Sequence, residues 1–572
     1  MSKNLPISSS TENIAGIPDS LSEKSNQNKL NQGFASIADL YLSNPEDVMN
    51  LKRAANLLCE TNYIDHCLSE ERFAELLIRL FEKGLSKNLQ GDITCHANIA
   101  LREKYSDLSA METLSEDTDV DKKMRLIQIM SSDKLLHFTL SFDFNRDLFI
   151  ENIIKKTRKE IFLNHRNYED ISGIEELLAS IAMQNYWNEY IYLNEPNEED
   201  KIKHYLDELE NSKHLKSIHW RKVLLLTCYL ELPKIGLPFD AHYPKPLRKI
   251  KRFQIDNYLD EIKRQKNFKL DPEIYDQVSL SVKSQYEENP YPRWTSIKLK
   301  NQLKMSLQEY LRQNFKLSHQ DKIFNKKQKT ALIAGCGTGK QIYRLYNSVN
   351  DVKISAIDLS LTSLAYAERM LSEAGVDEVK LRQKDILNLH SLQEKFDYIE
   401  CGGVLHHLKN PQQGLENLVN SLNHNGYLML ALYSKKAREI LQPTKTFISN
   451  NNIKKFSLIS IKLREHLAVE ANNGNDLAKA MFGQFSDMFS RSMYRDLLFH
   501  EQEYEYDLIQ IKSMTERASL KFRGIGLNTS EICEIYERIK PVTLIDWHEI
   551  ESKLENTQLF SGMYHLLFQN SC

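Results

Sequence analysis

Residues 330–339 of this chain read T-A-L-I-A-G-C-G-T-G, a strand-and-turn pattern from which the fold class can be inferred. Its apolar half, 331–334, predicts a buried parallel strand, because such a strand is covered on both faces and reads as a continuous apolar run. Glycines at the alternate positions 335, 337 and 339 then let the backbone turn sharply beside a ligand. The residues that follow are compatible with a helix, so the order is that of a nucleotide-binding βαβ unit.

Three classes of ligand compete for this turn. A P-loop needs four residues between its first glycine and a Gly-Lys pair, then Ser or Thr. Here the interval is shorter, and Gln341 follows Lys340. A dinucleotide turn, G-x-G-x-x-G, would need glycine where Lys340 stands. The pattern G-x-G-x-G instead resembles the first motif of class I S-adenosylmethionine (SAM) methyltransferases, where the turn passes beneath the methionine and ribose of the cofactor.

Acidic residues follow the next two predicted strands. Asp358 ends a strand predicted over 352–357. In this type of fold, a carboxylate about 20 residues past the first glycine accepts hydrogen bonds from the ribose hydroxyls of the ligand, and Asp358 is at about that distance. Asp385 follows a strand over 379–383. In the methyltransferase family an acidic residue there meets the adenine amino group, and its apolar neighbour lies against the ring. The resemblance thus implies a SAM site made of Gly335, Cys336, Gly337, Thr338, Gly339, Asp358, Leu359, Asp385, Ile386 and Gly402.

Alternating strands and helices continue after this site. Ser360 is a candidate N-cap for a helix that ends near Ala374 at Gly375, and a second helix is predicted over 411–422. Further strands are predicted over 396–401, 426–433, 520–524 and 562–569, with helices over 530–539 and 544–554 between the last two. The predicted fold class is α/β: a seven-stranded class I methyltransferase sheet whose last strand is antiparallel. An all-α module precedes it, and a helical insertion separates strands five and six.

Composition and pattern divide the chain into six predicted parts. They are a Ser- and Asn-rich disordered tail (1–34), an all-helical interaction or dimerisation module (35–270), a linker (271–310), the SAM-binding core (311–433), a helical insertion (434–515) and the last two strands with their helices (516–572). Residues 245–269 are basic. They can hold RNA phosphates or form a solvated helical linker with its own ion pairs, and the second interpretation is favoured.

Bulk composition indicates an ordinary globular protein. Of the 572 residues, 27% are charged and 41% hydrophobic, and the net charge of −3 gives no general attraction to nucleic acid or an anionic membrane. The eight cysteines form no C-x-x-C pair, which argues against a metal site and suits a reducing compartment. No apolar stretch approaches the ~18 residues of a membrane span. We therefore expect a cytoplasmic protein without membrane insertion.

Two segments are candidates for the acceptor side of the site. Residues 285–294 read Q-Y-E-E-N-P-Y-P-R-W, and their two prolines fix an extended backbone that places aromatic side chains rigidly. They either wall the pocket or clasp the helical module to the core. Residues 494–503 form a polar-aromatic cluster in the insertion. The candidate acceptor-side residues are Tyr291, Trp294, His406, His407, Tyr433, Asp496, His500 and Glu503.

A purely structural role is the alternative interpretation for several of these residues. One of the adjacent histidines 406 and 407 can simply pack after its strand, and Asp496 can cap a helix or pair with Arg495. Cys336 is interpreted as a small residue that fills space in the glycine turn. A thiol nucleophile there would need an electropositive site and a partner base, and Lys340 alone does not supply them.

Several stretches resemble one bacterial methyltransferase group in which a helical or tetratricopeptide-like region precedes the SAM domain. They are 184–190 (Q-N-Y-W-N-E-Y), 285–294, 495–503 and 560–564. Helical architecture and an Asn-, Lys- and Ile-rich composition also look like the rickettsial-type lysine methyltransferases that modify an outer-membrane protein. The chain departs from that group at D-L-L-F-H-E-Q-E-Y-E-Y, where a more basic, His-containing end is usual, so its acceptor preference is in doubt.

The resulting expectation is a SAM-dependent methyltransferase acting on protein lysine, working as a homodimer, with an outer-membrane or surface protein before export as the implied substrate. At pH 7 only about one lysine amine in a few thousand is neutral. Burial against aromatic groups near the sulfonium would lower the pKa of that amine. A tRNA or small-molecule methyltransferase is the alternative, and a SAM-binding scaffold is the alternative from another class.

Overall fold

The structure is a computed structural model. It describes residues 38, 42, 54, 70–82, 92–211, 217–238, 241–274, 276–294, 304–317, 327–376, 378–454, 457–500, 502–526, 530–554, 559–560 and 562–570. The predicted tail, 1–34, lies outside the described residues. The chain divides into two units: one comprises residues 1–108 and 134–139, and the other comprises 109–133 and 140–572.

The described part of the first unit is helical. It contains α3 (Glu70–Glu82), α4 (Asp92–Asp107) and the first part of α7 (Lys134–Phe142). Phe81 stacks on Phe138 with ring centroids 5.6 Å apart. No helix among the described residues combines the length and the apolar character that crossing a lipid bilayer demands.

The second unit begins with the larger share of the predicted helical module. Its helices are α5 (Ala110–Thr113), α6 (Val120–Ser132), α8 (Leu148–Leu163), α9 (Ile174–Trp187), α10 (Pro196–Glu210), α11 (Ser217–Thr227), α12 (Lys245–Lys251), α13 (Asn257–Gln265) and α14 (Gln277–Glu288). The buried stripe predicted on α9 is present: Leu177, Leu178 and Ile181 are all nearly inaccessible to solvent. Helix α14 belongs to the segment that leads into the sheet domain.

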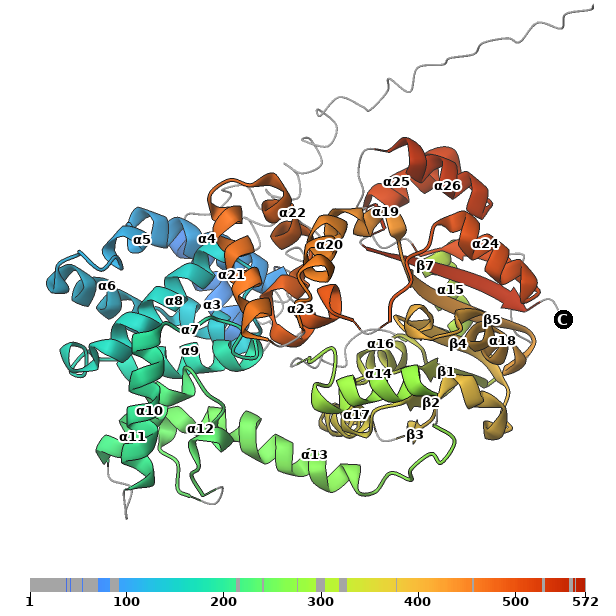
Figure 1. The fold of residues 1–572 in the computed structure, drawn as a ribbon. Coiled ribbons are helices and arrows are strands. Elements are labelled where there is room, and N and C mark those ends of the chain that lie inside the picture. The colour runs from blue at the N-terminus through green and yellow to red at the C-terminus, as the bar shows by residue number, and fades with distance from the viewer. Residues whose placement is uncertain are drawn as a thin grey trace, which may run out of the picture. The chain divides into compact units, whose positions relative to one another are not determined.

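This unit contains a seven-stranded sheet (Figure 1). Its strands are β1 (Lys329–Ala334), β2 (Val352–Asp358), β3 (Lys380–Gln383), β4 (Phe396–Gly402), β5 (Leu422–Tyr433), β6 (Leu520–Ile525) and β7 (Met563–Asn570). Their order is β3-β2-β1-β4-β5-β7-β6, and β7 is antiparallel to both of its neighbours while β1 to β5 are parallel. The predicted class I methyltransferase sheet, with its antiparallel last strand, is confirmed.

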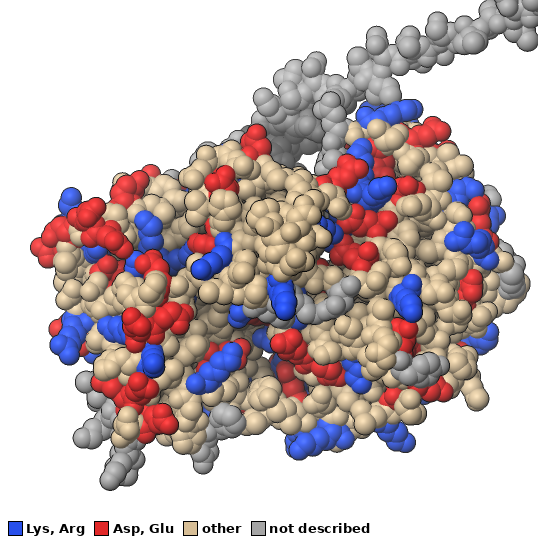
Figure 2. Space-filling model, viewed as in Figure 1, with Lys and Arg blue, Asp and Glu red and all other residues tan. Residues whose placement is uncertain are grey.

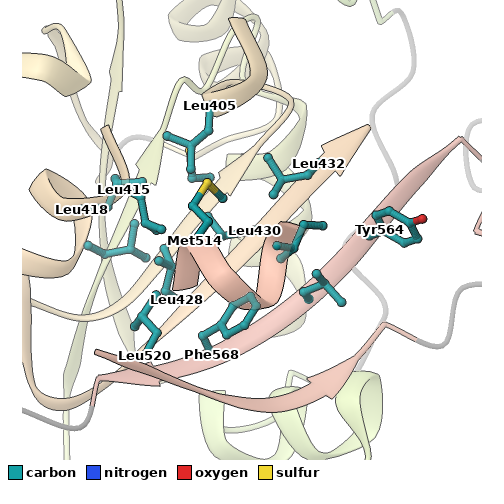
Figure 3. Close-up of a cluster of buried hydrophobic side chains, with 14 of the residues drawn as sticks. Leu405, Leu415, Leu418, Leu428, Leu430, Leu432, Met514, Leu520, Tyr564 and Phe568 are labelled. Atoms are coloured by element: carbon teal, nitrogen blue, oxygen red, sulfur yellow. The ribbon is translucent and has the colours of Figure 1, made fainter. Parts of the chain in front are cut away.

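Helices cover both faces of the sheet. On one face Leu428, Leu430 and Leu432 of β5 pack against α18 (Pro411–Asn420) and α24 (Leu508–Arg517), as Figure 3 shows for Leu415, Leu418 and Met514. On the other face, alternate residues of β1 and β5 pack against α15 (Leu307–Phe315), α16 (Lys340–Ser348) and α17 (Leu361–Glu373). Burial on both sides explains why these strands read as apolar runs.

Two predicted boundaries near β5 are corrected by the structure. The helix expected to reach residue 422 ends at Asn420, and the strand expected from 426 begins at Leu422. Leu422 pairs with Phe396 of β4, and the register then shifts before Tyr398 pairs with Tyr427. Pairing across a bulge therefore extends the strand through an Asn- and His-containing stretch that has no strand signal of its own.

Between β5 and β6 the chain forms the expected helical insertion. Its helices are α19 (Lys435–Arg438), α20 (Gln442–Asn450), α21 (Leu458–Asn472), α22 (Asp476–Gln484), α23 (Arg491–Leu498) and α24. Two more helices, α25 (Ser530–Ile539) and α26 (Leu544–Lys553), precede β7. The insertion is tied to α8 by a buried bidentate ion pair, in which Arg464 Nη1 and Nη2 lie 2.6 and 2.7 Å from the carboxylate oxygens of Glu151.

Replacing Glu151 by alanine is expected to lower the free energy of unfolding by about 3–5 kcal/mol, because it removes the bidentate partner of the fully buried Arg464, whose other acidic neighbour, Glu465, lies 4.0 Å away. Urea denaturation of the full chain measures the change. The double variant Glu151→Met/Arg464→Met is the control, since exchanging both charges for apolar groups of similar volume is close to neutral. Equal stability of the single variant and the wild type would contradict a stabilising role for the pair.

Candidate functional site

The glycine turn after β1 is enclosed by other parts of the chain. Gly335, Gly337 and Gly339 have φ angles of 75°, 51° and 87°, which L-residues rarely adopt. A Cβ on Gly337 would lie 2.6 Å from the carbonyl oxygen of Tyr291, and one on Gly335 would lie 2.3 Å from Val404 Cγ2. Glycine is therefore required here both for conformation and for the close approach of the 289–294 segment.

Asp358, at the carboxyl end of β2, braces the same turn. Its two carboxylate oxygens accept hydrogen bonds from Gly337 N at 2.7 Å and from Ser360 N at 2.9 Å. Burial raises the pKa of Asp358 to about 6, against the lowering effect of these N–H groups. Each oxygen keeps a second acceptor direction, so the side chain can still receive a ribose hydroxyl.

Asp385 provides the sharpest test of whether an adenosyl group fits this site. Its Oδ1 accepts from Leu387 N at 2.9 Å, and its Oδ2 is buried. The hydroxyl of Ser279, on α14, interacts with the same carboxyl, and this hydrogen bond opposes the effect of burial on the pKa of Asp385. Burial raises the pKa of Asp385. Because each carboxylate oxygen has two acceptor directions, Oδ2 can accept from an adenine amino group beside the Ser279 hydroxyl.

The other predicted cofactor residues surround these two carboxylates. Ile386 is buried beside Asp385, Leu359 follows Asp358, and Gly402 ends β4 next to the turn. Cys336 is buried within the turn, and burial raises the pKa of its thiol well above the usual value. That environment fits the space-filling interpretation of the thiol, because a nucleophilic cysteine needs a lowered pKa.

The proline-containing segment closes over the cofactor side. Trp294 Nε1 donates to Thr338 O at 2.8 Å, and Tyr366 Oη donates to Trp294 O at 2.8 Å. The Trp294 ring is buried in the core with Tyr343, 5.5 Å away between ring centroids. These contacts of Trp294 are all with the methyltransferase core, so its ring anchors the segment there.

Most of the remaining candidates do meet. Seven residues, called here the tyrosine–histidine cluster, gather at the carboxyl ends of β4 and β5 from α14, the 289–294 segment, the turn after β4, the end of β5 and the insertion. His406 stacks on Tyr433 at 3.8 Å and His407 on His500 at 3.6 Å, while Tyr286 lies 6.4 Å from Tyr291 between centroids. The members are Tyr286, Tyr291, His406, His407, Tyr433, Asp496 and His500.

Asp496 supplies a buried carboxylate to this cluster. Its Oδ1 accepts from Tyr286 Oη at 3.0 Å and from Gln285 Nε2 at 3.4 Å, and His500 Nε2 lies 3.7 Å away. The alternative interpretation of Asp496 as a partner of Arg495 on a solvated helix does not describe its position, since its side chain is only 5% exposed.

Hydrogen bonds assign the protons of two histidines. Gln502 N donates to His500 Nδ1 at 3.2 Å, so the proton of neutral His500 is on Nε2, facing Asp496. His407 Nδ1 donates to Gln502 O at 2.9 Å, which leaves the lone pair on Nε2. Burial lowers the pKa of His406 and His407, and that of His500 to about 2, so all three rings are neutral at pH 7.

Glu503 has a different position from the other candidates. It lies 2.8 Å from Arg438 Nη2 and 2.8 Å from Lys445 Nζ, so its charge is compensated. Arg438 in turn lies over the ring of Tyr433, 3.9 Å from its centroid. The geometry gives Glu503 a supporting role, in which it orients the cation that packs against Tyr433.

Three residues of the site were not singled out from the sequence: Tyr286, Arg438 and Asp487. Tyr286 was visible in the Q-Y-E-E-N-P-Y-P-R-W stretch, but its position on the last turn of α14 was not. Asp487 precedes α23 and carries no local signal. Burial and the neighbouring charge of Asp496 raise the pKa of Asp487 to about 6, and its charge also acts on Tyr291 and Tyr433.

Other potential sites are weaker. A surface pocket of about 610 Å³ lies at the amino ends of the strands, lined by Lys395, His424, Arg517 and Asn570 among others, away from the glycine turn. Ligands of open α/β sheets bind at the carboxyl ends instead. Although three histidines meet in the cluster, no three His, Cys, Asp or Glu side chains in the described part of the chain are arranged to hold a metal ion.

Comparisons with known proteins agree with this geometry. Residues 325–481 match the family described as Methyltransferase domain. An uncharacterised protein of Synechococcus sp. is 29% identical over 204 residues, covering 34% of this chain and 48% of that protein. The tRNA U34 carboxymethyltransferase of Campylobacter jejuni is 30% identical over 128 residues, covering 22% and 43%.

One solved structure similar to this chain is that of PKMT2 from Rickettsia typhi. It is 18% identical with a TM-score of 0.36, covering 49% of this chain and 54% of that one. The chain thus spans about half the length of the relatives that it matches.

Proposed function

We propose that this chain, which contains a class I SAM-dependent methyltransferase domain, transfers methyl groups from SAM to lysine side chains of a protein. The observation that carries the proposal is the tyrosine–histidine cluster, where three tyrosine rings and the Asp496 carboxylate meet beside the glycine turn. Aromatic faces and carboxylates together suit an alkylammonium group.

The reaction requires placement more than covalent participation by the protein. When SAM is bound, its sulfonium presents a methyl carbon for in-line attack by the nitrogen lone pair: the new N–C bond forms as the C–S bond breaks, and the nitrogen loses one proton. Asp358 and Asp385 are placed to hold the adenosyl part, and the enclosed glycine turn limits water at the reacting centre.

The acceptor amine must lose its proton before it attacks. Tyr286, Tyr291 and Tyr433 are placed to hold the ammonium form, and the aromatic surroundings lower the pKa of the amine by desolvation. Asp496 orients the cation through its charge. His407 is the residue best suited to accept the proton, because its Nδ1 is committed to Gln502 O and its Nε2 carries the lone pair.

A tRNA methyltransferase is the second candidate, and the tRNA-modifying relative from Campylobacter jejuni is the observation that favours it. Two features favour the protein acceptor. The charges of the basic stretch 245–269 are partly compensated, since Arg264 pairs with Asp260 at 2.8 Å and Lys251 with Asp256 at 2.5 Å. On the face that Figure 2 displays, basic and acidic side chains are intermixed, whereas RNA phosphates favour a basic surface.

Labelling with tritiated SAM tests the proposal. The purified full chain is incubated with separate protein, RNA and metabolite fractions of a bacterial lysate, and labelled protein is hydrolysed to identify methylated lysine. The expected result is label in protein as methyl-lysine, absent from an Asp358→Ala control that cannot hold the cofactor. Label confined to RNA would establish the second candidate instead, and no label in any fraction would favour a scaffold.

The pKa of Asp487 predicts how acceptor binding depends on pH. This carboxyl is protonated below about pH 6 and negative above it, so the affinity for a cationic acceptor should increase as the pH rises through 6. We expect the KM for the labelled protein acceptor to fall about three- to tenfold between pH 5 and 7. In the Asp487→Asn variant, the KM should no longer change in this way between pH 5 and 7. If the KM of the variant still fell over this range, Asp487 would not be the group responsible.

A further inference from the structure

The stretch Q-N-Y-W-N-E-Y at 184–190 is distinctive in the sequence, and the tyrosine–histidine cluster does not include it. It covers the end of α9 and the turn that follows. Glu189 and Tyr190 have φ angles of 58° and 55°, two consecutive non-glycine residues in the left-handed region. Such a conformation costs of order 1–3 kcal/mol per residue and persists where surrounding contacts impose it. The contacts of Glu189 show what imposes it here.

Glu189 binds the first turn of α23, which is distant in sequence. Its Oε2 accepts from Ser492 N at 2.5 Å, and its Oε1 accepts from Ser492 Oγ at 2.9 Å. Ser490, the N-cap residue of α23, makes no side-chain cap of its own. A backbone bond from Arg491 N to Asn188 O, 3.1 Å long, runs beside these contacts. The carboxylate of Glu189 thus caps α23 in place of a residue of that helix.

Helix α23 positions the buried carboxylate of the cluster. Asp496 lies on this helix, and its Oδ1 receives the hydrogen bonds from Tyr286 and Gln285. Arg495, the preceding residue, donates through Nη2 to Gln285 O at 3.4 Å. A displacement of the first turn of α23 would therefore move Asp496 relative to α14.

The same carboxylate faces the cofactor side. Arg293 Nε lies 3.6 Å from Glu189 Oε1, and the guanidinium of Arg293 lies 5.8 Å from the ring centroid of Tyr186 on α9. Arg293 stands between Pro292, whose carbonyl accepts from Thr338 Oγ1, and Trp294, which donates to Thr338 O. Thr338 is part of the glycine turn. Glu189 is accordingly in contact with both the helix that carries Asp496 and the segment that closes over the cofactor.

We propose that Glu189 is a positioning residue that couples cofactor binding to the arrangement of α23 on the acceptor side. The effect on catalysis rests on the proposed function, whereas the coupling itself can be measured by comparing the free protein with the SAH-bound protein. Ordering of the 289–294 segment by S-adenosylhomocysteine (SAH) would be transmitted through Arg293 and Glu189 to Ser492.

The test uses hydrogen exchange and calorimetry on the full chain. In wild type, SAH should slow amide exchange both in 289–294 and in the first turn of α23. In Glu189→Gln the protection of α23 should no longer respond to SAH, and the SAH dissociation constant should increase about fivefold, as for the loss of a charged cap and its ion pair. Glu176→Gln, on the exposed face of α9, is the matched control and should behave as wild type.

A double-mutant cycle separates coupling from a purely structural role. If Glu189 acts on SAH through Arg293, the variant Glu189→Gln/Arg293→Met should lose little more affinity than either single variant. Additive losses, or an α23 that still responds to SAH in Glu189→Gln, would overturn the proposal. The two hypotheses fail differently: a wild type that does not bind SAH contradicts the methyltransferase proposal, whereas normal SAH binding without a response in α23 contradicts the coupling.

Discussion

Gly337→Ala is expected to weaken SAH binding by about 100-fold or more while leaving the sheet folded. The φ angle of 51° disfavours alanine by about 1–2 kcal/mol. The added Cβ would also meet the carbonyl oxygen of Tyr291 at 2.6 Å, so the segment that covers the turn must move. A combined cost of about 3 kcal/mol corresponds to the 100-fold loss. Isothermal titration calorimetry with SAH provides the measurement, and circular dichroism checks the fold.

Gly236→Ala is the matched control for this experiment. Gly236 has a φ angle of 78°, and a Cβ there would have no neighbour within 4 Å, so the variant introduces backbone strain without a steric contact. It should cost some stability and leave SAH affinity unchanged. If Gly337→Ala bound SAH as tightly as wild type, the close packing of the 289–294 segment against the turn would have no part in cofactor binding.

Asp496→Asn is expected to reduce kcat/KM for the protein acceptor by about 100-fold with little change in SAH affinity. Asparagine retains the shape of the side chain and an oxygen that can accept from Tyr286 Oη, so the main change is loss of the negative charge. Removing the charged partner of a buried cation costs about 2–5 kcal/mol, which corresponds to at least about 30-fold. Filter binding with tritiated SAM and the labelled protein acceptor measures the rates.

Asp476→Asn serves as the control, because Asp476 is exposed on α22 of the same insertion. It should leave both SAH affinity and methyl transfer unchanged. An Asp496→Asn variant with a normal rate would remove Asp496 from the acceptor site. A variant that lost SAH binding together with activity would indicate instead that Asp496 acts through the cofactor side, as the coupling through α23 allows.

The positions of Asp358 and Asp385 near strand ends were predictable because local signals mark the strands that precede them. A buried strand precedes Asp358, Ser360 begins the next helix as its N-cap, and glycines mark the turn after β1. The same local logic failed at Leu422, where strand pairing with Phe396 extends β5 beyond its apolar part. Proximity in sequence also suggested that Trp294 and Tyr291 belong to one site. In the structure, Trp294 packs in the core of the sheet domain, whereas Tyr291 lies beside Tyr286.

Local sequence signals were enough to predict the βαβ order, the seven strands, the antiparallel end of the sheet and the carboxylates near the ends of β2 and β3. These features follow from the preferences of neighbouring residues for strand, turn and helix, which act over a few positions. Only the tertiary structure decided that Tyr286 reaches Asp496 and that Glu189 caps a helix 303 positions further along the chain. These contacts form between segments that are far apart in the sequence and meet only when the chain packs. The residues next to each carboxylate therefore do not indicate which donors it will bind.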